Sequence, residues 1–238
     1  MLEIRSITKK YGEKVAVDNL SLTIEAGDIY GFIGHNGAGK TTTLKACCGI
    51  LRPDEGDILI DGISVIDSPI EAKRIIAYIP DDPKLYDYLT GIQYLNFICD
   101  VYGVKSDLRQ QRINKYAEML EIKDDLAKSI SEYSHGMKQK LAVISGLVHN
   151  PKVFLMDEPF VGLDPKASFM LKNLMKEHCR EGGAIFFSTH VLEVAQKLCN
   201  KISIIKSGKL IVSGNIDDVV GDRSLEDVFM NPEEGNNA

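Results

Sequence analysis

The segment GHNGAGKT, residues 34–41, constrains this chain more than any other feature. It follows the apolar run DIYGFI, precedes a helix-like run from about Lys40 to Gly49, and fits the pattern G-x-x-x-x-G-K-[ST]. Glycines let such a loop turn tightly, so that its backbone amides surround a phosphate. Lys40 would lie along the β- and γ-phosphate oxygens, and the Thr41 hydroxyl would hold Mg²⁺. This strand–loop–helix unit therefore predicts an α/β fold with a phosphate-binding loop.

Strand-like and helix-like runs alternate through most of the chain. The runs VFLMD, GAIFFSTH and KISIIKSGKLIVSG read as strands in the C-terminal half, the last with a hairpin turn at Ser207–Gly208. Residues 90–149 read mostly as helices and open with Thr90 and Gln93 as a capping box. The pattern predicts a mostly parallel core sheet with a helical insertion. The final run NPEEGNNA predicts a frayed tail.

Two further strands end in polar side chains that suit phosphate chemistry. VFLMD ends at Asp157, which is expected to hold Mg²⁺ through water, and Glu158 follows as a candidate general base. On its own, Asp–Glu–Pro is more often a plain strand exit, but beside a phosphate loop it indicates a nucleotide hydrolase. His190 ends FFSTH and is expected to reach a γ-phosphate, although a lone histidine there is usually structural. Tyr11, before Gly12, is either a turn aromatic or an adenine-stacking face, and the residues alone favour the turn.

The run SEYSHGMKQKLAVISGLVHN, residues 131–150, predicts a helix that begins near Gly136. Ser134 suits a helix cap, yet free amides at a helix start together with a hydroxyl also form an anion site. Taken alone, the stretch favours the cap.

Bulk properties exclude several classes of protein. A net charge of −6 and a pI near 5.4 argue against a nucleic-acid surface. No stretch approaches the roughly 18 apolar residues of a membrane helix, and the N-terminus lacks the apolar run of a secretory signal. Five cysteines without a Cys-x-x-Cys spacing disfavour a disulfide framework or zinc site and point to the cytosol.

With these motifs in order, residues 2–218 resemble the nucleotide-binding subunit of ATP-binding-cassette (ABC) transporters. YSHGM, residues 133–137, stands where the family has Leu-Ser-Gly-Gly-Gln, and GLDP, residues 162–165, stands where it has the D-loop. The resemblance implies a single ATP-binding domain over residues 1–238 with the P-loop NTPase ABC fold. In that fold an antiparallel N-terminal β-subdomain joins a mostly parallel core sheet, and a helical subdomain, here about 86–150, is inserted.

The resemblance also assigns roles to individual residues, with ATP and Mg²⁺ as ligands. Glu158 and His190 become catalytic, and Thr41, Asp157 and Asp81 become metal-binding. In this family two subunits pack head to tail, so a second set, Ser134, His135, Gly136 and Asp164, would contact the ATP of the partner subunit. Ser134 is then expected to be both cap and phosphate contact. The expected ATP-binding residues are Tyr11, Gly34, His35, Asn36, Gly37, Ala38, Gly39, Lys40, Thr41 and Thr42.

Three positions depart from the family pattern. His135 replaces a glycine, Met137 replaces a glutamine, and Asp81 stands where the Q-loop glutamine is usual. A carboxylate at Asp81 can ligand Mg²⁺ but repels a γ-phosphate. We expect Asp81 to take part in metal binding.

The resemblance implies an ATPase that powers transport through separately encoded membrane-spanning permease subunits, with a second ATP-binding subunit that forms a homodimer. The segment PKLYDYLTGIQYL is a candidate docking surface, and SLEDVFM resembles exporter-type subunits. The expected location is peripheral, on the cytoplasmic face of a bacterial cell membrane, without nucleic-acid partners.

Two alternatives remain at the level of sequence. The first is a soluble cassette ATPase not coupled to transport, although such proteins usually carry two cassettes or long coiled-coil insertions. The second is a P-loop GTPase or kinase. Neither Asn114–Lys115 nor Asn200–Lys201 continues into Asn-Lys-x-Asp, and a kinase would leave YSHGM and GLDP unexplained.

Overall fold

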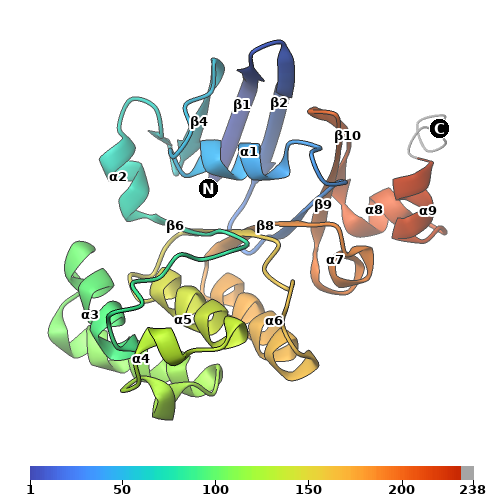
Figure 1. The fold of residues 1–238 in the computed structure, drawn as a ribbon. Coiled ribbons are helices and arrows are strands. Elements are labelled where there is room, and N and C mark those ends of the chain that lie inside the picture. The colour runs from blue at the N-terminus through green and yellow to red at the C-terminus, as the bar shows by residue number, and fades with distance from the viewer. Residues whose placement is uncertain (232–238) are drawn as a thin grey trace.

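The computed structural model describes residues 1–231, which form two β-sheets and a set of helices (Figure 1). The expected frayed tail, apart from Asn231, lies outside the described residues. The order of elements confirms the α/β fold expected from the alternating pattern.

The larger sheet has six strands in the order β10-β9-β3-β8-β7-β6. All neighbours pair in parallel except β10, which forms an antiparallel hairpin with β9 through the expected turn at Ser207 and Gly208. Every residue of β3, β7 and β8 is buried, which explains their continuous apolar runs. The strands are β3 (Ile29–Ile33), β6 (Ile76–Ile79), β7 (Val153–Asp157), β8 (Ala184–Thr189), β9 (Lys201–Lys206) and β10 (Lys209–Asn215).

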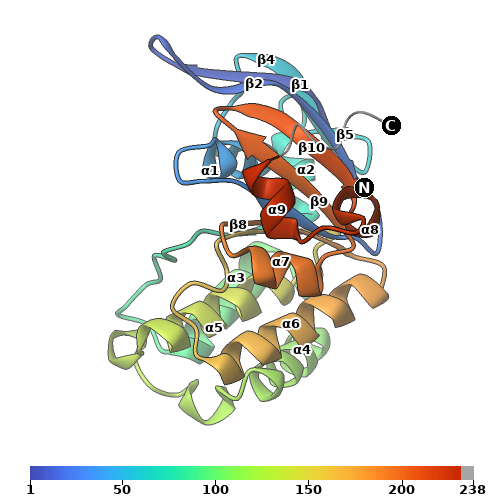
Figure 2. The same ribbon diagram turned by 90° about the vertical axis from the view of Figure 1, so that its right-hand side faces the viewer.

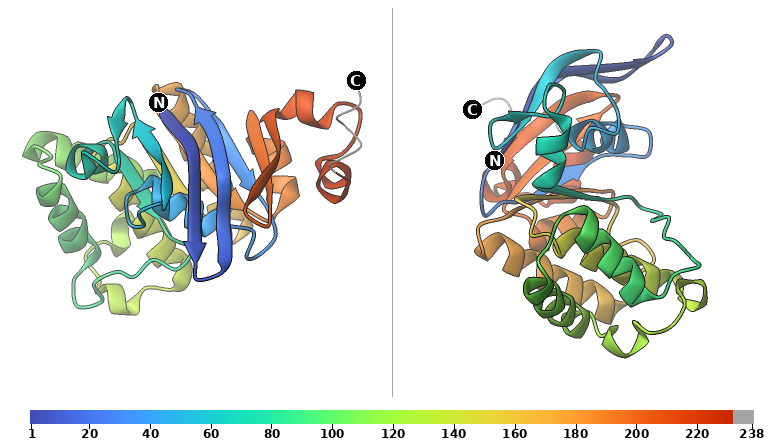
Figure 3. Two further views of the ribbon diagram at one scale, coloured as in Figure 1. Left: turned by 90° about the horizontal axis from the view of Figure 1, so that it is seen from above. Right: turned by 90° about the vertical axis from the view of Figure 1, so that its left-hand side faces the viewer.

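The smaller sheet is antiparallel and comes from the N-terminal part of the chain. Its order is β2-β1-β4-β5, with β1 (Leu2–Tyr11), β2 (Lys14–Ile24), β4 (Glu55–Ile60) and β5 (Ile63–Ser64). Helix α1 (Lys40–Cys47) lies between the two sheets, and its buried Leu44 belongs to the same apolar core as strands of both (Figure 1). The view from above in Figure 3 shows this sheet, in blue and cyan, lying across the core.

Helices cover the face of the larger sheet that points away from α1 and the smaller sheet (Figure 2). Helices α3 (Gly91–Val101), α4 (Ser106–Met119) and α5 (His135–Leu147) lie between β6 and β7 in the chain, with short 3₁₀ turns at Lys123–Asp125 and Ile130–Glu132. The capping box of Thr90 and Gln93 at the start of α3 is confirmed. The remaining helices are α2 (Pro69–Arg74), α6 (Pro165–Arg180), α7 (Leu192–Leu198), α8 (Ile216–Val220) and α9 (Leu225–Met230).

The structure also bears on the expectations about cysteines and membrane-spanning helices. All five cysteines are free and buried, and burial raises the pKa of Cys48 to about 11, so these thiols act as small core residues. Across residues 1–231, every helix is too short or too polar to cross a membrane.

Candidate active site

The polar residues singled out above gather at one edge of the larger sheet. Strands β3, β8, β7 and β6 are adjacent and parallel, so the residues that follow their carboxyl ends lie on the same side. These are the loop at 34–41, His190, Glu158 and Asp81. Such an edge is where open α/β sheets bind ligands.

The loop between β3 and α1 passes so close to neighbouring strands that only glycine fits at two of its positions. A Cβ on Gly39 would lie 2.4 Å from the Ala16 carbonyl oxygen, and Gly39 has φ 113°. A Cβ on Gly34 would lie 2.6 Å from the Ile205 carbonyl oxygen. The loop is therefore held between β2 and β9 with its amides at the start of α1, the geometry that binds phosphate.

Lys40 is the cation of this loop and is 6% exposed. Its Nζ donates to the carbonyl oxygens of Gly34 at 2.7 Å and His35 at 3.3 Å. The same atom lies 3.3 Å from Glu158 Oε1. The ammonium group is thus fixed along the loop and paired with a carboxylate that an incoming phosphate would have to replace.

Asp157 is held by hydroxyl groups from two different elements. Its Oδ2 accepts a hydrogen bond from Thr41 Oγ1 at 2.6 Å, and its Oδ1 accepts one from Ser188 Oγ at 2.5 Å. The donor set of hydroxyl and carboxylate oxygens suits a hard cation such as Mg²⁺. Residues 1–231 contain no group of three or more His, Cys, Asp or Glu that could hold a metal ion.

Glu158 lies beside His190, its candidate catalytic partner. Glu158 Oε2 is 3.0 Å from His190 Nδ1, while Oε1 faces Lys40 and, within residues 1–231, has no hydrogen-bond partner. Glu158 also adopts φ 47°, a backbone conformation that is uncommon away from glycine. Strain of this kind is often found at functional sites.

A cleft of 440 Å³ opens over the loop. Of the expected ATP-binding residues, Gly34 and Ala38 are buried beneath its lining, and Tyr11, 52% exposed, stands at its edge. Asp81 also faces the cleft, although its Oδ1 accepts from the Asp82 amide at 2.9 Å. The lining consists of Tyr11, Lys14, Ala16, His35, Asn36, Gly37, Gly39, Lys40, Thr41, Thr42, Asp81 and Glu158.

The residues expected to contact a partner's ATP lie outside this cleft. Ser134 caps α5, accepting a hydrogen bond from the Met137 amide at 3.3 Å, and is exposed. A Cβ on Gly136 would meet nothing within 4 Å. Asp164 caps α6 through the Ala167 amide at 2.8 Å, and this hydrogen bond lowers its pKa. The cap predicted for Ser134 is confirmed, and its surface is open.

His135 lies against Gly162, a contact that the sequence did not reveal. A Cβ on Gly162 would lie 3.0 Å from His135 Cδ2, so the imidazole ring covers the D-loop glycine of its own chain.

Four further residues near the site were also missed. Lys14 and Ala16 line the cleft because β2 pairs with β1 beside Tyr11. Ser188 binds Asp157, and Phe229 in α9 packs on His35 with ring centroids 4.7 Å apart. Only Ser188 left a local signal, because it and Thr189 are polar residues at the end of an otherwise apolar strand.

Comparison with protein families matches residues 17–161, more than half of the chain, to the ABC transporter family. This chain belongs to that family. The ABC proteins similar to it include YhcH of Bacillus subtilis, an uncharacterized ATP-binding protein, at 36% identity over 92% of this chain and 71% of that one. NatA of B. subtilis, an ABC transporter ATP-binding protein, is 32% identical over 96% and 95%. YbhF of Escherichia coli, described as a probable multidrug ABC transporter ATP-binding protein, is 34% identical over 92% and 38%.

Solved structures of ABC proteins share the whole fold. An ATP-binding subunit of an ABC transporter superposes with TM-score 0.92 at 30% identity, over 97% of this chain and 98% of that one. CbiO1 of Clostridium perfringens, part of the transporter complex cbiONQ, gives 0.81 at 26% identity, over 98% and 96%. A dimeric ATP-binding cassette in a post-hydrolysis state with ADP and phosphate gives 0.79 at 25% identity, over 91% and 99%.

These comparisons confirm the expected ABC ATPase fold and the assignment as an ATP-binding subunit with ATPase activity. The roles of individual residues remain predictions.

Proposed function

We propose that this subunit hydrolyses ATP to power export through separately encoded membrane subunits, and that it works as a head-to-tail homodimer. The convergence of Lys40, Asp157 and Glu158 at one edge of the parallel sheet carries the proposal. Lys40 lies more than 100 positions before Asp157 and Glu158 in the chain, yet all three lie where a nucleoside triphosphate on the loop would need them.

The chemistry follows from the contacts around Glu158. ATP phosphates displace Glu158 from Lys40, because the ammonium group then gains phosphate oxygens in place of one carboxylate. Glu158 is left to take a proton from the attacking water, while His190 holds its other oxygen and faces the γ-phosphate. Thr41 and Asp157 would hold Mg²⁺, which would supply charge neutralisation on the phosphates. The water oxygen forms a bond to the γ-phosphorus, the bond between the β–γ bridging oxygen and the γ-phosphorus breaks, and ADP and phosphate leave.

The second half of each ATP site would come from the partner subunit. The start of α5 has amides without intrahelical partners, an exposed Ser134 and an unobstructed Gly136, and it does not line the cleft of its own chain. A helix start of this kind attracts an anion. The dimeric structure of a related cassette with ADP and phosphate supports dimer formation by such subunits.

An exposed aromatic cluster supports docking to a membrane subunit. Tyr86 stacks on Tyr88 at 5.8 Å and meets Tyr94 and Phe97 edge-on at 6.0 and 5.7 Å. Tyr88 is 81% exposed, although a ring of this size usually packs against other residues. Tyr86, Tyr88 and Tyr94 belong to the segment predicted as a docking surface, and Phe97 follows it in α3.

Two relatives bear on the direction of transport and on location. The description of YbhF as a probable multidrug subunit supports export, since multidrug transporters expel their substrates. CbiO1 supports a place in a membrane complex, because that protein is part of one. We therefore propose a peripheral position on the cytoplasmic face of a bacterial membrane.

Copurification tests this function. Tagged Glu158→Gln is incubated with ATP, membranes of the source cells are solubilised in mild detergent, and the bound proteins are identified. We expect a stoichiometric multi-helix membrane protein whose recovery falls when Tyr88 and Phe97 are changed to serine. Recovery from the soluble fraction without a membrane partner would favour the soluble cassette ATPase instead.

A further inference from the structure

Ser188 forms side-chain hydrogen bonds with both Asp157 and Glu158 at the candidate ATP site. It is the next-to-last residue of β8, is 0% exposed, and pairs in register with Asp157 of β7. The family resemblance gave it no role.

A single hydroxyl group makes both contacts. Ser188 Oγ donates to Asp157 Oδ1 at 2.5 Å and accepts from the Glu158 amide at 3.0 Å. A hydroxyl has one hydrogen to donate and lone pairs to accept with, so the two bonds are compatible. Both lie in the interior, where loss of one partner leaves the other polar group unpaired.

The bond to Asp157 fixes the direction of the metal-facing oxygen. A carboxylate turns easily about its last torsion, and the Thr41 hydroxyl alone would hold only one of its two oxygens. With Oδ1 anchored on β8, Oδ2 is held toward Thr41. A partner behind a metal ligand acts in the same way in other metal sites.

The bond to Glu158 holds its backbone. Glu158 has φ 47°, and without a fixed amide the chain can relax toward ordinary dihedral angles. Relaxation would swing the carboxylate away from His190 Nδ1, now 3.0 Å away.

We propose that Ser188 is a positioning residue, which aims Asp157 at the metal and holds Glu158 in the conformation that faces His190. This inference rests on the proposed roles of Asp157 and Glu158. It makes one hydroxyl group responsible for both Mg²⁺ affinity and the turnover rate.

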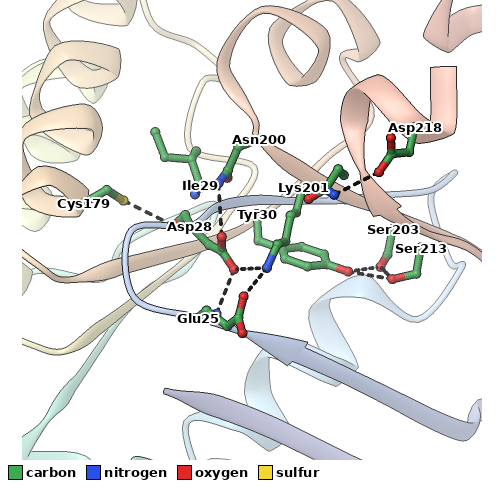
Figure 4. A network of polar contacts seen from close by, with 11 residues as sticks. Glu25, Asp28, Ile29, Tyr30, Cys179, Asn200, Lys201, Ser203, Ser213 and Asp218 are labelled. Carbon is green, nitrogen blue, oxygen red and sulfur yellow. Dashed lines mark hydrogen bonds and ion pairs between the residues drawn. The ribbon is translucent and has the colours of Figure 1, made fainter. Parts of the chain in front are cut away.

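The test compares Ser188→Ala with Ser203→Ala. Ser203 is also 0% exposed, on β9 of the same sheet, and bonds Tyr30 and Ser213 at 2.5 and 3.1 Å rather than the site (Figure 4). Both variants lose a buried hydroxyl, so a general loss of stability affects both. Only Ser188→Ala should disturb the metal site.

The first readout is Mg²⁺ titration of a bound fluorescent ATP analogue that is not hydrolysed, and the second is turnover at saturating ATP and Mg²⁺. We expect Ser188→Ala to raise the half-saturating Mg²⁺ concentration about tenfold or more, the usual effect of removing a partner of a metal ligand. Its kcat should also fall, while nucleotide binding in EDTA stays as in wild type. Ser203→Ala should leave Mg²⁺ half-saturation unchanged.

Two more variants keep the test decisive. Ser188→Thr keeps the hydroxyl and should retain wild-type Mg²⁺ affinity. Ser188→Cys has a similar side-chain volume but a weaker hydrogen-bond donor, and it takes the place of Ser188→Ala if that variant is unfolded. Unchanged Mg²⁺ half-saturation in Ser188→Ala or Ser188→Cys overturns the inference. Failure of wild type to bind or hydrolyse ATP would instead overturn the proposed function.

Discussion

Thr41 Oγ1 donates a 2.6 Å hydrogen bond to Asp157 Oδ2, although the two residues are 116 positions apart in the chain. The contact joins the start of α1 to the end of β7 and brings together the oxygen donors that suit Mg²⁺. The contact therefore links the phosphate loop directly to the end of the strand that carries Asp157.

Ser134→Asp separates the two roles of the residue at the start of α5. Aspartate is as good a helix cap as serine, so stability should stay near wild type. In a head-to-tail dimer its charge would face the triphosphate, and a like charge at about 4 Å costs roughly 1–4 kcal/mol. We expect at least about a tenfold loss of turnover, with ATP affinity of the monomer unchanged because Ser134 lies outside its own cleft.

The control is Ser68→Asp, the same change at the N-cap of α2. It should alter neither turnover nor ATP affinity. Turnover of Ser134→Asp equal to that of the control would remove the case for a composite site.

Asp81→Asn and Asp81→Ala test the unusual Q-loop carboxylate. Asp81 faces the cleft, and a Mg²⁺ ligand contributed directly or through water would raise the affinity for the metal. Both variants should need more Mg²⁺ for half-maximal ATP turnover. The matched control is Asp82→Asn, because Asp82 is exposed, pairs with Lys84 and does not line the cleft. If the Mg²⁺ curves of all three variants coincide with wild type, Asp81 has no part in metal binding.

His149 should make stability depend on pH. Its ring stacks on Tyr102 at 3.7 Å, and its Nε2–H donates to the Ile76 carbonyl oxygen at 3.0 Å. Nδ1 is buried and has no partner among residues 1–231, and burial lowers the pKa of His149 to about 4. Because the unfolded chain takes up this proton near pH 6.5, the contribution is complete above pH 6.5 and is lost as the pH falls toward 4.

The size of this contribution is on the order of 3 kcal/mol. Chemical denaturation of wild type between pH 7 and 4 should therefore show a falling free energy of unfolding, and His149→Phe should flatten the slope. Burial also lowers the pKa of His178, so part of the slope should remain. Tyr102→Phe keeps the stacked ring and should retain the full slope. An undiminished slope in His149→Phe would assign the effect to other groups.

Sequence alone predicted those parts of the site that depend on short, continuous segments of the chain. The loop at 34–41, the strands that end at Asp157 and Thr189, and the caps at Thr90 and Ser134 each follow from a few neighbouring residues. Local pattern determines such features because glycine conformation, apolar runs and capping bonds involve only nearby backbone.

The parts that were missed depend on strand register and on packing between distant segments. Ser188 meets Asp157 only because β7 and β8 pair in one particular register. His135 covers Gly162, and Phe229 packs on His35, through contacts between elements far apart in the chain. No periodicity or motif in the sequence indicates these contacts, so only the folded structure reveals them.

The most direct test of ATP hydrolysis at this site is turnover by Glu158→Gln, measured beside nucleotide binding on the same preparation. Glutamine keeps the shape of the side chain but cannot accept the proton, so turnover should fall on the order of 10²–10⁴-fold. ATP should bind at least as tightly as to wild type, because Lys40 no longer has a carboxylate 3.3 Å away competing with phosphate. Turnover within a few-fold of wild type would contradict the role of Glu158 as the general base and, with it, the account of this site.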